Sequence, residues 1–122
     1  MFIAQETAHP LDTSRLPDEF AISVITLGEL HAGVLAARDI ETRTRRLATL
    51  EALASIYVLP INEEVALIWA YLRARLADVG RRLNVNDSWI AATALVHDLP
   101  IVTQDSDYSV LSDVAGFAFY KL

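Results

Sequence analysis

Short apolar runs alternate with longer segments of helical periodicity, and this alternation constrains the fold more than any other feature of the chain. Runs of strand length occupy residues 20–25, 56–61, 99–103 and 117–120. The segments between them place apolar side chains along one helix face. Because strands that alternate with helices pair in parallel through right-handed crossovers, the sequence predicts an α/β fold around a parallel sheet. The length of 122 residues predicts one domain, spanning residues 1–122.

Capping signals predict where the helices begin and end. Thr26, followed by Glu29 at capping-box spacing, predicts a helix that runs to about Ala37. The next helix is expected to begin at Asp39 or Thr42 and to bury a stripe of leucines that includes Leu47 and Leu53. The remaining signals are an Asn62 cap, a Gly80 stop, a buried helix from Ser88 to His97 opened by Asn86 or Asp87, and a helical turn from Asp107 to Leu111.

Composition excludes several kinds of site. The chain has no cysteine, so disulfides, thiolate zinc sites and cysteine nucleophiles are excluded. Without an apolar run of transmembrane length or a basic leader, we expect a cytoplasmic protein that does not contact a membrane. The net charge of −6 argues against tight binding of nucleic acid over the whole surface. Two arginine clusters either belong to solvated helix faces or bind RNA or an acidic partner: Arg43, Arg45 and Arg46, and Arg73, Arg75, Arg81 and Arg82.

Acidic residues follow the apolar runs at several places. Glu29 lies shortly after the run at 20–25, and Asp87 lies at the start of the buried helix. Asp105 and Asp107 follow the run that ends at residue 103. In an open parallel sheet these positions share one edge, outside the carboxyl ends of the strands, where ligands bind. Carboxylates gathered there repel one another unless a cation joins them, and Mg²⁺ or Mn²⁺ prefers oxygen ligands. The pattern therefore indicates metal-assisted chemistry and favours a phosphodiester substrate.

Each acid taken alone also has a structural explanation. Glu29 fits a capping box, and Asp87 fits the first turn of a helix, where negative charge is stabilising. Asp105 and Asp107 fit a turn. The combination favours a site, because three separate segments bring acids to the same edge of the sheet. Phosphodiester hydrolysis gives a reason for this convergence, since it needs a deprotonated water and neutralised charge, and divalent ions held by carboxylates provide both.

Three segments of the chain are similar to the motifs of one known family. Residues 23–37 (Ser-Val-Ile-Thr-Leu-Gly-Glu-Leu-His-Ala-Gly-Val-Leu-Ala-Ala) resemble the second acidic motif of PIN-domain ribonucleases, in the branch of VapC toxins. Residues 86–94 (Asn-Asp-Ser-Trp-Ile-Ala-Ala-Thr-Ala) resemble the third, and residues 101–108 (Ile-Val-Thr-Gln-Asp-Ser-Asp-Tyr) resemble the last. The three motifs occur in the family's order and at family-like spacing, and the resemblance covers nearly the whole chain.

The resemblance implies an α/β/α sandwich around a central parallel sheet. It also implies a Mg²⁺- or Mn²⁺-dependent endoribonuclease toxin that cleaves RNA, forms a homodimer and is neutralised by a cognate VapB-like antitoxin. Position by position, it assigns roles to six residues: Glu29, Asp87 and Asp105 as catalytic, metal-binding acids, Asp107 as a further metal ligand, and Asn86 and Thr103 as supporting residues.

The N-terminus departs from the family's pattern. The family begins with an apolar strand that ends in Asp-Thr-Ser, whose aspartate is a metal ligand. Asp12-Thr-Ser14 has these letters, but no apolar run precedes it and it lies too close to Glu29 for a strand, a helix and their connection. Residues 2–4 instead match the residues that follow the family's Asp-Thr-Ser. The expectation is an N-terminally truncated domain, whose first strand and aspartate lie upstream of Met1 and whose sheet has two unpaired inner edges.

The missing aspartate leaves a second hypothesis open. In it the chain is a catalytically degenerate PIN-domain protein that serves as an antitoxin-binding or dimerising module. A flavodoxin-like receiver with an acidic pocket is disfavoured, because no aspartate directly follows the run at 56–61. The metal-dependent ribonuclease toxin is the first hypothesis.

Overall fold

The computed structural model describes residues 1–5, 19–103, 107–114 and 116–121. Within them a five-stranded sheet has the order β3-β2-β1-β4-β5, and every neighbouring pair of strands is parallel. This confirms the predicted α/β fold. The strands are β1 (Phe2–Gln5), β2 (Phe20–Ser23), β3 (Tyr57–Leu59), β4 (Ile101–Thr103) and β5 (Phe119–Lys121).

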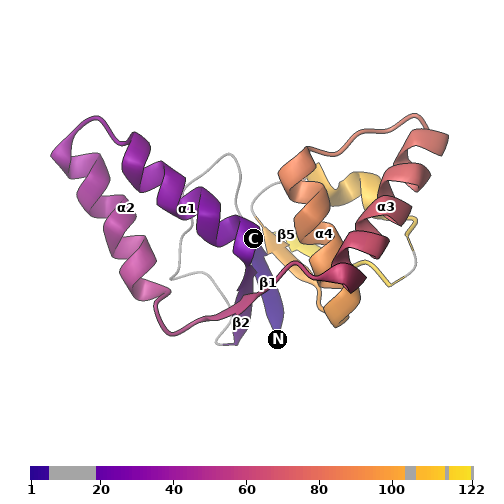
Figure 1. Ribbon diagram of the computed structural model, residues 1–122, viewed down its shortest axis with the longest axis horizontal. Helices are drawn as coiled ribbons and strands as arrows, with labels where there is room; N and C mark the ends of the chain where they lie inside the picture. Colours follow the sequence, from indigo (N-terminus) through magenta and orange to yellow (C-terminus); the bar gives the residue numbers. More distant parts are fainter. Residues whose placement is uncertain (6–18, 104–106, 115, 122) are drawn as a thin grey trace.

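Helices cover both faces of the sheet, so the expected sandwich is confirmed. Figure 1 shows α1 and α2 on one side of the strands and α3 and α4 on the other. Successive side chains of a strand point to opposite faces. Ile3 and Ala21 therefore belong to the core under α3 and α4, whereas Ala4 and Ile22 belong to the core that α1 covers. The helices are α1 (Val24–Ala36), α2 (Ile40–Ala52), α3 (Glu63–Asp78) and α4 (Val85–His97), followed by the 3₁₀ helix η2 (Asp107–Leu111).

The central place in the sheet is filled by β1, which corrects the expectation of two unpaired inner edges. β1 pairs with β2 on one side and with β4 on the other. Ile3 and Ala4 are fully buried, and the amide of Ile3 donates a hydrogen bond of 2.9 Å to the carbonyl of Pro100. Because unpaired inner edges would leave buried backbone groups unsatisfied, this short apolar segment takes the place between β2 and β4. The strand contains no acid, and Asp12-Thr-Ser14 lies outside the described residues.

Helix α1 begins earlier than its sequence signal indicated. The hydroxyl of Ser23, at the end of β2, accepts a 3.1 Å hydrogen bond from the amide of Ile25 and so caps the helix. Thr26 is consequently inside the helix and buried, and Glu29 is its sixth residue. The capping-box interpretation of Glu29 is therefore wrong, and its carboxylate needs another explanation.

Helix α4 also begins earlier than expected. The side-chain oxygen of Asn84 accepts hydrogen bonds from the amides of Asn86, at 2.8 Å, and Asp87, at 3.4 Å. Asn84 is therefore the cap, and Asp87 is the third residue of the helix. The Asn62 cap of α3 is confirmed, and Gly80 follows α3 with a φ of +67°, a conformation that favours glycine.

Helix α2 stands away from the sheet. No side chain of α2 is buried, and Leu47, expected in its core stripe, is 41% exposed. Leu53, just beyond the helix, is buried as predicted. Leu47 is exposed because α2 packs on α1 rather than on the strands. No helix in the described part of the chain is long and apolar enough to cross a membrane.

Asp39 caps α2, as predicted, and the stability that this cap contributes depends on pH. The pKa of Asp39 is lowered from 3.8 by hydrogen bonds that its carboxylate accepts from the backbone amide and then from the hydroxyl of Thr42. A folded pKa below the unfolded one means that the charged cap stabilises the fold above the unfolded pKa, and that this contribution is lost as pH falls through the folded pKa.

An NMR titration of the Asp39 carboxyl carbon should therefore have its midpoint below 3.8. Thr42→Val should raise the midpoint part of the way back, because it removes the hydroxyl but keeps the backbone amide. A wild-type midpoint at or above 3.8 would contradict the observed capping geometry.

Candidate functional site

Glu29 lies in the second turn of α1, and its carboxylate reaches the first turn of α4. Its Oε2 accepts a hydrogen bond of 3.4 Å from the Nδ2 of Asn86. Its Oε1 is buried and has no hydrogen-bond partner in the described part of the chain. Because buried polar atoms almost always have a partner, this oxygen is suited to a ligand that the protein does not itself supply. Glu29 thus joins helices from the two opposite layers.

Asp87 is oriented from a third segment of the chain. It is 1% exposed, and its Oδ1 accepts a hydrogen bond of 3.3 Å from the hydroxyl of Tyr108. Tyr108 belongs to η2 and is itself fully buried. The N-terminus of α4 favours negative charge at Asp87. The second, third and last motifs of the chain therefore meet at this point through Glu29, Asn86, Asp87 and Tyr108.

The remaining predicted residues are placed only in part. Thr103 ends β4 and is fully buried. Asp105 lies outside the described residues, and Asp107 begins η2 with a side chain that is likewise outside the description. Among the described residues, no three His, Cys, Asp or Glu side chains lie close enough together to hold a metal ion. The convergence of Asp105 and Asp107 with Glu29 and Asp87 therefore stays a prediction.

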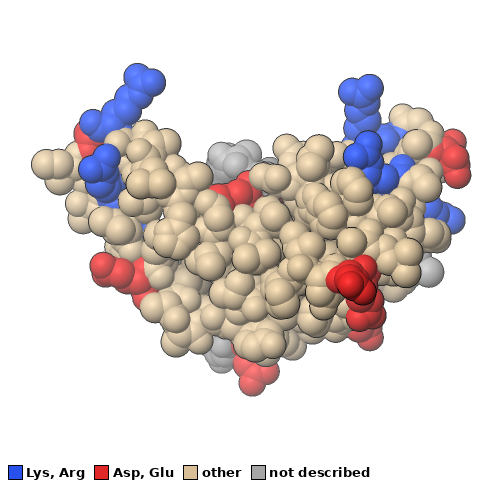
Figure 2. Space-filling model, viewed as in Figure 1, with Lys and Arg blue, Asp and Glu red and all other residues tan. Residues whose placement is uncertain are grey.

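The site lies over the carboxyl ends of the strands. β2 leads directly into α1, and α4 leads into β4, so the N-termini of both helices lie at this edge of the sheet. Figure 2 shows a hollow between the α1–α2 side and the α3–α4 side, with acidic side chains at its bottom and basic side chains on its rims. This is the edge at which open α/β sheets bind ligands. This edge of the sheet is therefore the candidate substrate site.

The donor set fits a hard divalent cation. Glu29 and Asp87 supply carboxylate oxygens, the ligands that Mg²⁺ and Mn²⁺ prefer. The buried Oε1 of Glu29 is the observation that supports this fit, because a cation would satisfy an oxygen that the described chain leaves without a hydrogen bond. Neutral supporting groups, the Asn86 amide and the Tyr108 hydroxyl, orient the carboxylates without cancelling their charge.

Sequence reasoning missed Tyr108 and Asn84. Tyr108 is the largest fully buried side chain among the described residues, and its hydroxyl donates a hydrogen bond to Asp87, which lies 21 residues earlier in the chain. The local signal was an aromatic residue one place after Asp107, to which the predicted helical turn assigned no role. Asn84 was hidden because three polar residues, Asn84, Asn86 and Asp87, all suit a cap.

Comparisons with known proteins agree with this architecture. The family model of the PIN domain matches residues 3–115. The chain is 47% identical over 122 residues to Ribonuclease VapC5 of Mycobacterium tuberculosis, and this match covers 100% of this chain and 90% of that protein. It is 46% identical over 103 residues to Ribonuclease VapC4 of the same organism, covering 80% of this chain and 79% of that one.

A solved structure extends the likeness to three dimensions. The crystal structure of VapBC-5 from Mycobacterium tuberculosis, a member of the VapBC family of toxin–antitoxin systems, contains a chain that matches with a TM-score of 0.89 at 41% identity. The match covers 99% of this chain and 98% of that one. The parallel sheet, the order of the motifs and these identities lead to one conclusion: the chain belongs to the PIN-domain family, in its VapC branch.

Proposed function

We propose that this chain is an endoribonuclease toxin of the VapC type, which cleaves RNA phosphodiesters with the help of Mg²⁺ or Mn²⁺. The observation that carries the proposal is the approach of Glu29 to the first turn of α4, where Asp87 lies with a buried carboxylate. The two relatives at 47% and 46% identity are both named ribonucleases, which supports the reaction.

Glu29 and Asp87 would hold the metal ion, and Asp105 and Asp107 complete the proposed set of acids. The proposal rests on the chemistry of the carboxylates and on the buried Oε1 of Glu29. A bound divalent ion would supply charge neutralisation at the phosphate and would lower the pKa of the attacking water.

The contribution of the chain itself is to orient the two carboxylates. The hydroxyl of Tyr108 fixes one oxygen of Asp87, and the amide of Asn86 fixes one oxygen of Glu29. The burial of Asp87 excludes water, so its charge acts through a lower dielectric than it would at the surface. Because these groups are in place before RNA binds, no reorganisation is needed when charge develops in the transition state. Thr103, at the buried end of β4, supports the floor of the site in this proposal.

The proposal includes a VapB-like antitoxin as the partner that silences the activity. The similar VapBC-5 structure belongs to a toxin–antitoxin system, which supports this assignment. Helices α1 and α2 expose large apolar side chains of the kind that mark a protein interface: Leu35 is 81% exposed, Ile40 is 84% exposed and Leu47 is 41% exposed. A homodimer and a cytoplasmic location complete the proposal.

A degenerate protein that only binds its antitoxin is the weaker hypothesis. β1 carries no acid, which is the one observation in its favour. Against it, Glu29 has no capping role, and its buried Oε1 is without a hydrogen-bond partner in the described chain. A carboxylate retained in this setting costs stability unless it binds something, so a ligand-binding site is the better explanation.

Cleavage of a labelled RNA by the purified chain tests the proposal. We expect cleavage with Mn²⁺ or Mg²⁺ and none with EDTA. Glu29→Gln should reduce the rate at least about 10-fold, because it removes the charge while keeping the shape and an oxygen for Asn86. Glu51→Gln, which changes an exposed glutamate of α2, is the matched control and should keep the wild-type rate. Cleavage that persists in EDTA, or equal rates for the two variants, would contradict the proposal.

A further inference from the structure

The two arginine clusters of the chain differ in what their guanidinium groups contact. In α2, Arg43 donates a 3.1 Å hydrogen bond to the carbonyl of Ala37, and Arg46 donates one of 2.5 Å to the carbonyl of Gly33. These carbonyls lie at the C-terminal end of α1, where helix groups lack internal partners and cations are stabilising. Arg43 and Arg46 therefore have a structural role, which is to hold α1 against α2.

The second cluster lines a pocket instead. Arg73, Arg81 and Arg82 lie around a cavity of about 820 Å³ between the C-terminal half of α3 and the segment at 81–84. In the described part of the chain, no hydrogen bond or ion pair engages these three guanidinium groups. Leu76 and Leu83 give the same cavity apolar walls. A volume of this size is typical of a ligand site, roughly 300–1,000 Å³.

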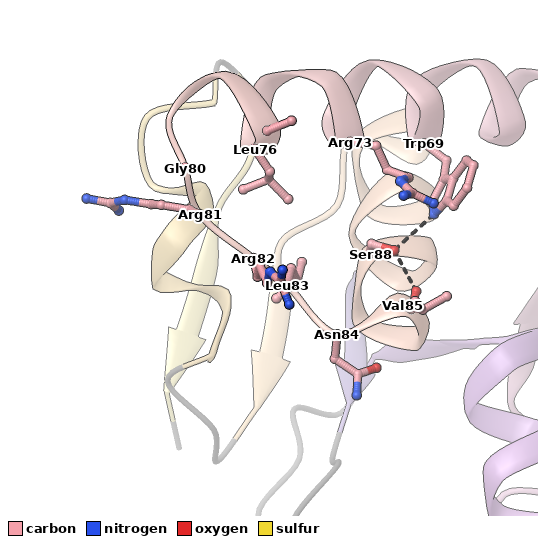
Figure 3. A pocket seen from close by; sticks show the side chains of 11 residues that line it. Trp69, Arg73, Leu76, Gly80, Arg81, Arg82, Leu83, Asn84, Val85 and Ser88 are labelled. Atoms are coloured by element: carbon pink, nitrogen blue, oxygen red, sulfur yellow. Dashed lines mark hydrogen bonds between the residues drawn. The ribbon is translucent and has the colours of Figure 1, made fainter.

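One arginine of this pocket is held in position by stacked aromatic rings. The guanidinium carbon of Arg73 lies 5.0 Å from the centre of the Trp69 ring, a cation–π contact. Trp69 stacks on Trp89 with ring centres 4.2 Å apart and 3° between the planes. The indole Nε1 of Trp69 donates a 2.9 Å hydrogen bond to the hydroxyl of Ser88, which donates in turn to the carbonyl of Val85. Figure 3 shows Arg73 beside Trp69 and the hydrogen bonds that lead from Trp69 through Ser88 to Val85 in the first turn of α4.

The pocket and the acidic site share the beginning of α4. Asn84 lines the pocket, and its side-chain oxygen accepts hydrogen bonds from the backbone amides of Asn86 and Asp87. Ser88, which also lines the pocket, directly follows Asp87 in the chain. The pocket therefore borders the first turn of α4, which carries the proposed metal-binding Asp87. In Figure 3, Arg82 lies near Leu83 and Asn84, whereas Arg81 extends away from the other side chains.

We propose that this pocket binds an unstacked nucleotide of single-stranded RNA next to the scissile phosphate, with Arg73 and Arg82 contacting the RNA phosphates. The inference rests on the proposed ribonuclease function and assigns its substrate class and a second contact site. Guanidinium groups match phosphate oxygens in geometry as well as charge. The apolar walls at Leu76 and Leu83 suit the face of a base, and proteins usually take bases from single strands rather than from A-form duplexes.

An acidic protein segment could meet the same arginines, but the apolar walls of the pocket and its position beside the first turn of α4 favour RNA. The chain has a net charge of −6, and its proposed catalytic hollow is acidic, so both repel a phosphodiester. A ribonuclease with this charge distribution needs local cations beside the acids to draw the RNA backbone in. An acidic peptide would meet the same repulsion, and it lacks a base that the apolar walls could cover.

The test is the binding of a short, unstructured, fluorescent RNA to the full chain in EDTA, measured by anisotropy over a series of salt concentrations. For single-stranded RNA, each phosphate contact contributes about 0.7 to the slope of log K against log salt. Arg73→Gln with Arg82→Gln should therefore lower the slope by about 1.4. Arg38→Gln is the charge-matched control, because Arg38 is exposed and does not line the pocket, and it should leave the slope unchanged. Thermal unfolding of each variant verifies that these exposed substitutions keep the fold.

Two outcomes would overturn the proposal. Equal losses of slope in Arg73→Gln, Arg82→Gln and Arg38→Gln would show a general charge effect, and no loss in the double variant would remove the pocket from RNA binding. An oligoglutamate peptide of the same length is the competing ligand, and a double variant that loses only the peptide would identify an acidic protein partner instead. EDTA separates this result from catalysis: arginine-dependent binding by a chain that never cleaves RNA would refute the ribonuclease function alone.

Discussion

Replacing Asp87 with asparagine will reduce metal-dependent RNA cleavage by about 100-fold or more. Asp87 is 1% exposed, so its charge acts in a setting that screens it little. The amide has nearly the same shape and keeps an oxygen that can accept the hydrogen bond of Tyr108. The substitution therefore removes charge from the site without opening a cavity. Initial rates on a labelled RNA at saturating Mn²⁺ measure the effect.

Asp78→Asn is the matched control, because Asp78 ends α3 and is exposed. This variant should cleave at the wild-type rate. A second readout distinguishes lost metal binding from lost folding: Mn²⁺ at 100 times its Kd should raise the free energy of unfolding by about 2.7 kcal/mol in the wild type and in Asp78→Asn, but not in Asp87→Asn. Equal cleavage by the two variants would exclude Asp87 from the site.

The second large effect concerns stability, and it tests the central position of β1. Ile3→Ala should lower the free energy of unfolding by about 2–5 kcal/mol, the usual cost of removing a buried isoleucine side chain down to its Cβ. Ile3 is 0% exposed and its strand pairs on both sides. The substitution therefore leaves a cavity in the core that water cannot reach. This is a large fraction of the roughly 5–15 kcal/mol that stabilises a typical domain. Urea denaturation monitored by circular dichroism measures the change.

Ile40→Ala provides the same chemical change at a position that is 84% exposed. Its effect should stay within about 0.5 kcal/mol, as for most surface substitutions. If Ile3→Ala destabilised the chain no more than Ile40→Ala, residues 2–5 would not be the central strand, and the strand order β3-β2-β1-β4-β5 would be wrong.

The order of strands and helices could be predicted from the sequence because it depends on local periodicity. The position of β1 could not. Residues 2–5 form a run of only four residues without the aspartate that marks the family's first strand, and only pairing with β2 and β4 makes it a central strand. The exposure of Leu47 could not be predicted from the sequence either, because it depends on the packing of α2 on α1 rather than on the sheet.

The candidate site likewise contains residues that the sequence could predict and residues that it could not. Glu29, Asn86 and Asp87 could be found from the sequence because each belongs to a motif with a recognisable neighbourhood. The predicted capping role of Glu29 was wrong, because the hydroxyl of Ser23 caps the helix one turn earlier than Thr26 would. Tyr108 joins the site through a single long-range hydrogen bond, which no local pattern predicts.

Anomalous diffraction from crystals of the full chain soaked in Mn²⁺ tests the central claim most directly. The account predicts a peak within coordination distance of carboxylate oxygens from both Glu29 and Asp87, roughly 2.0–2.6 Å for hard cations. The peak should disappear in crystals of Asp87→Asn treated in the same way. A peak bound only elsewhere on the molecule, or no peak at Mn²⁺ concentrations that support cleavage, would contradict a metal-dependent site built on these two acids.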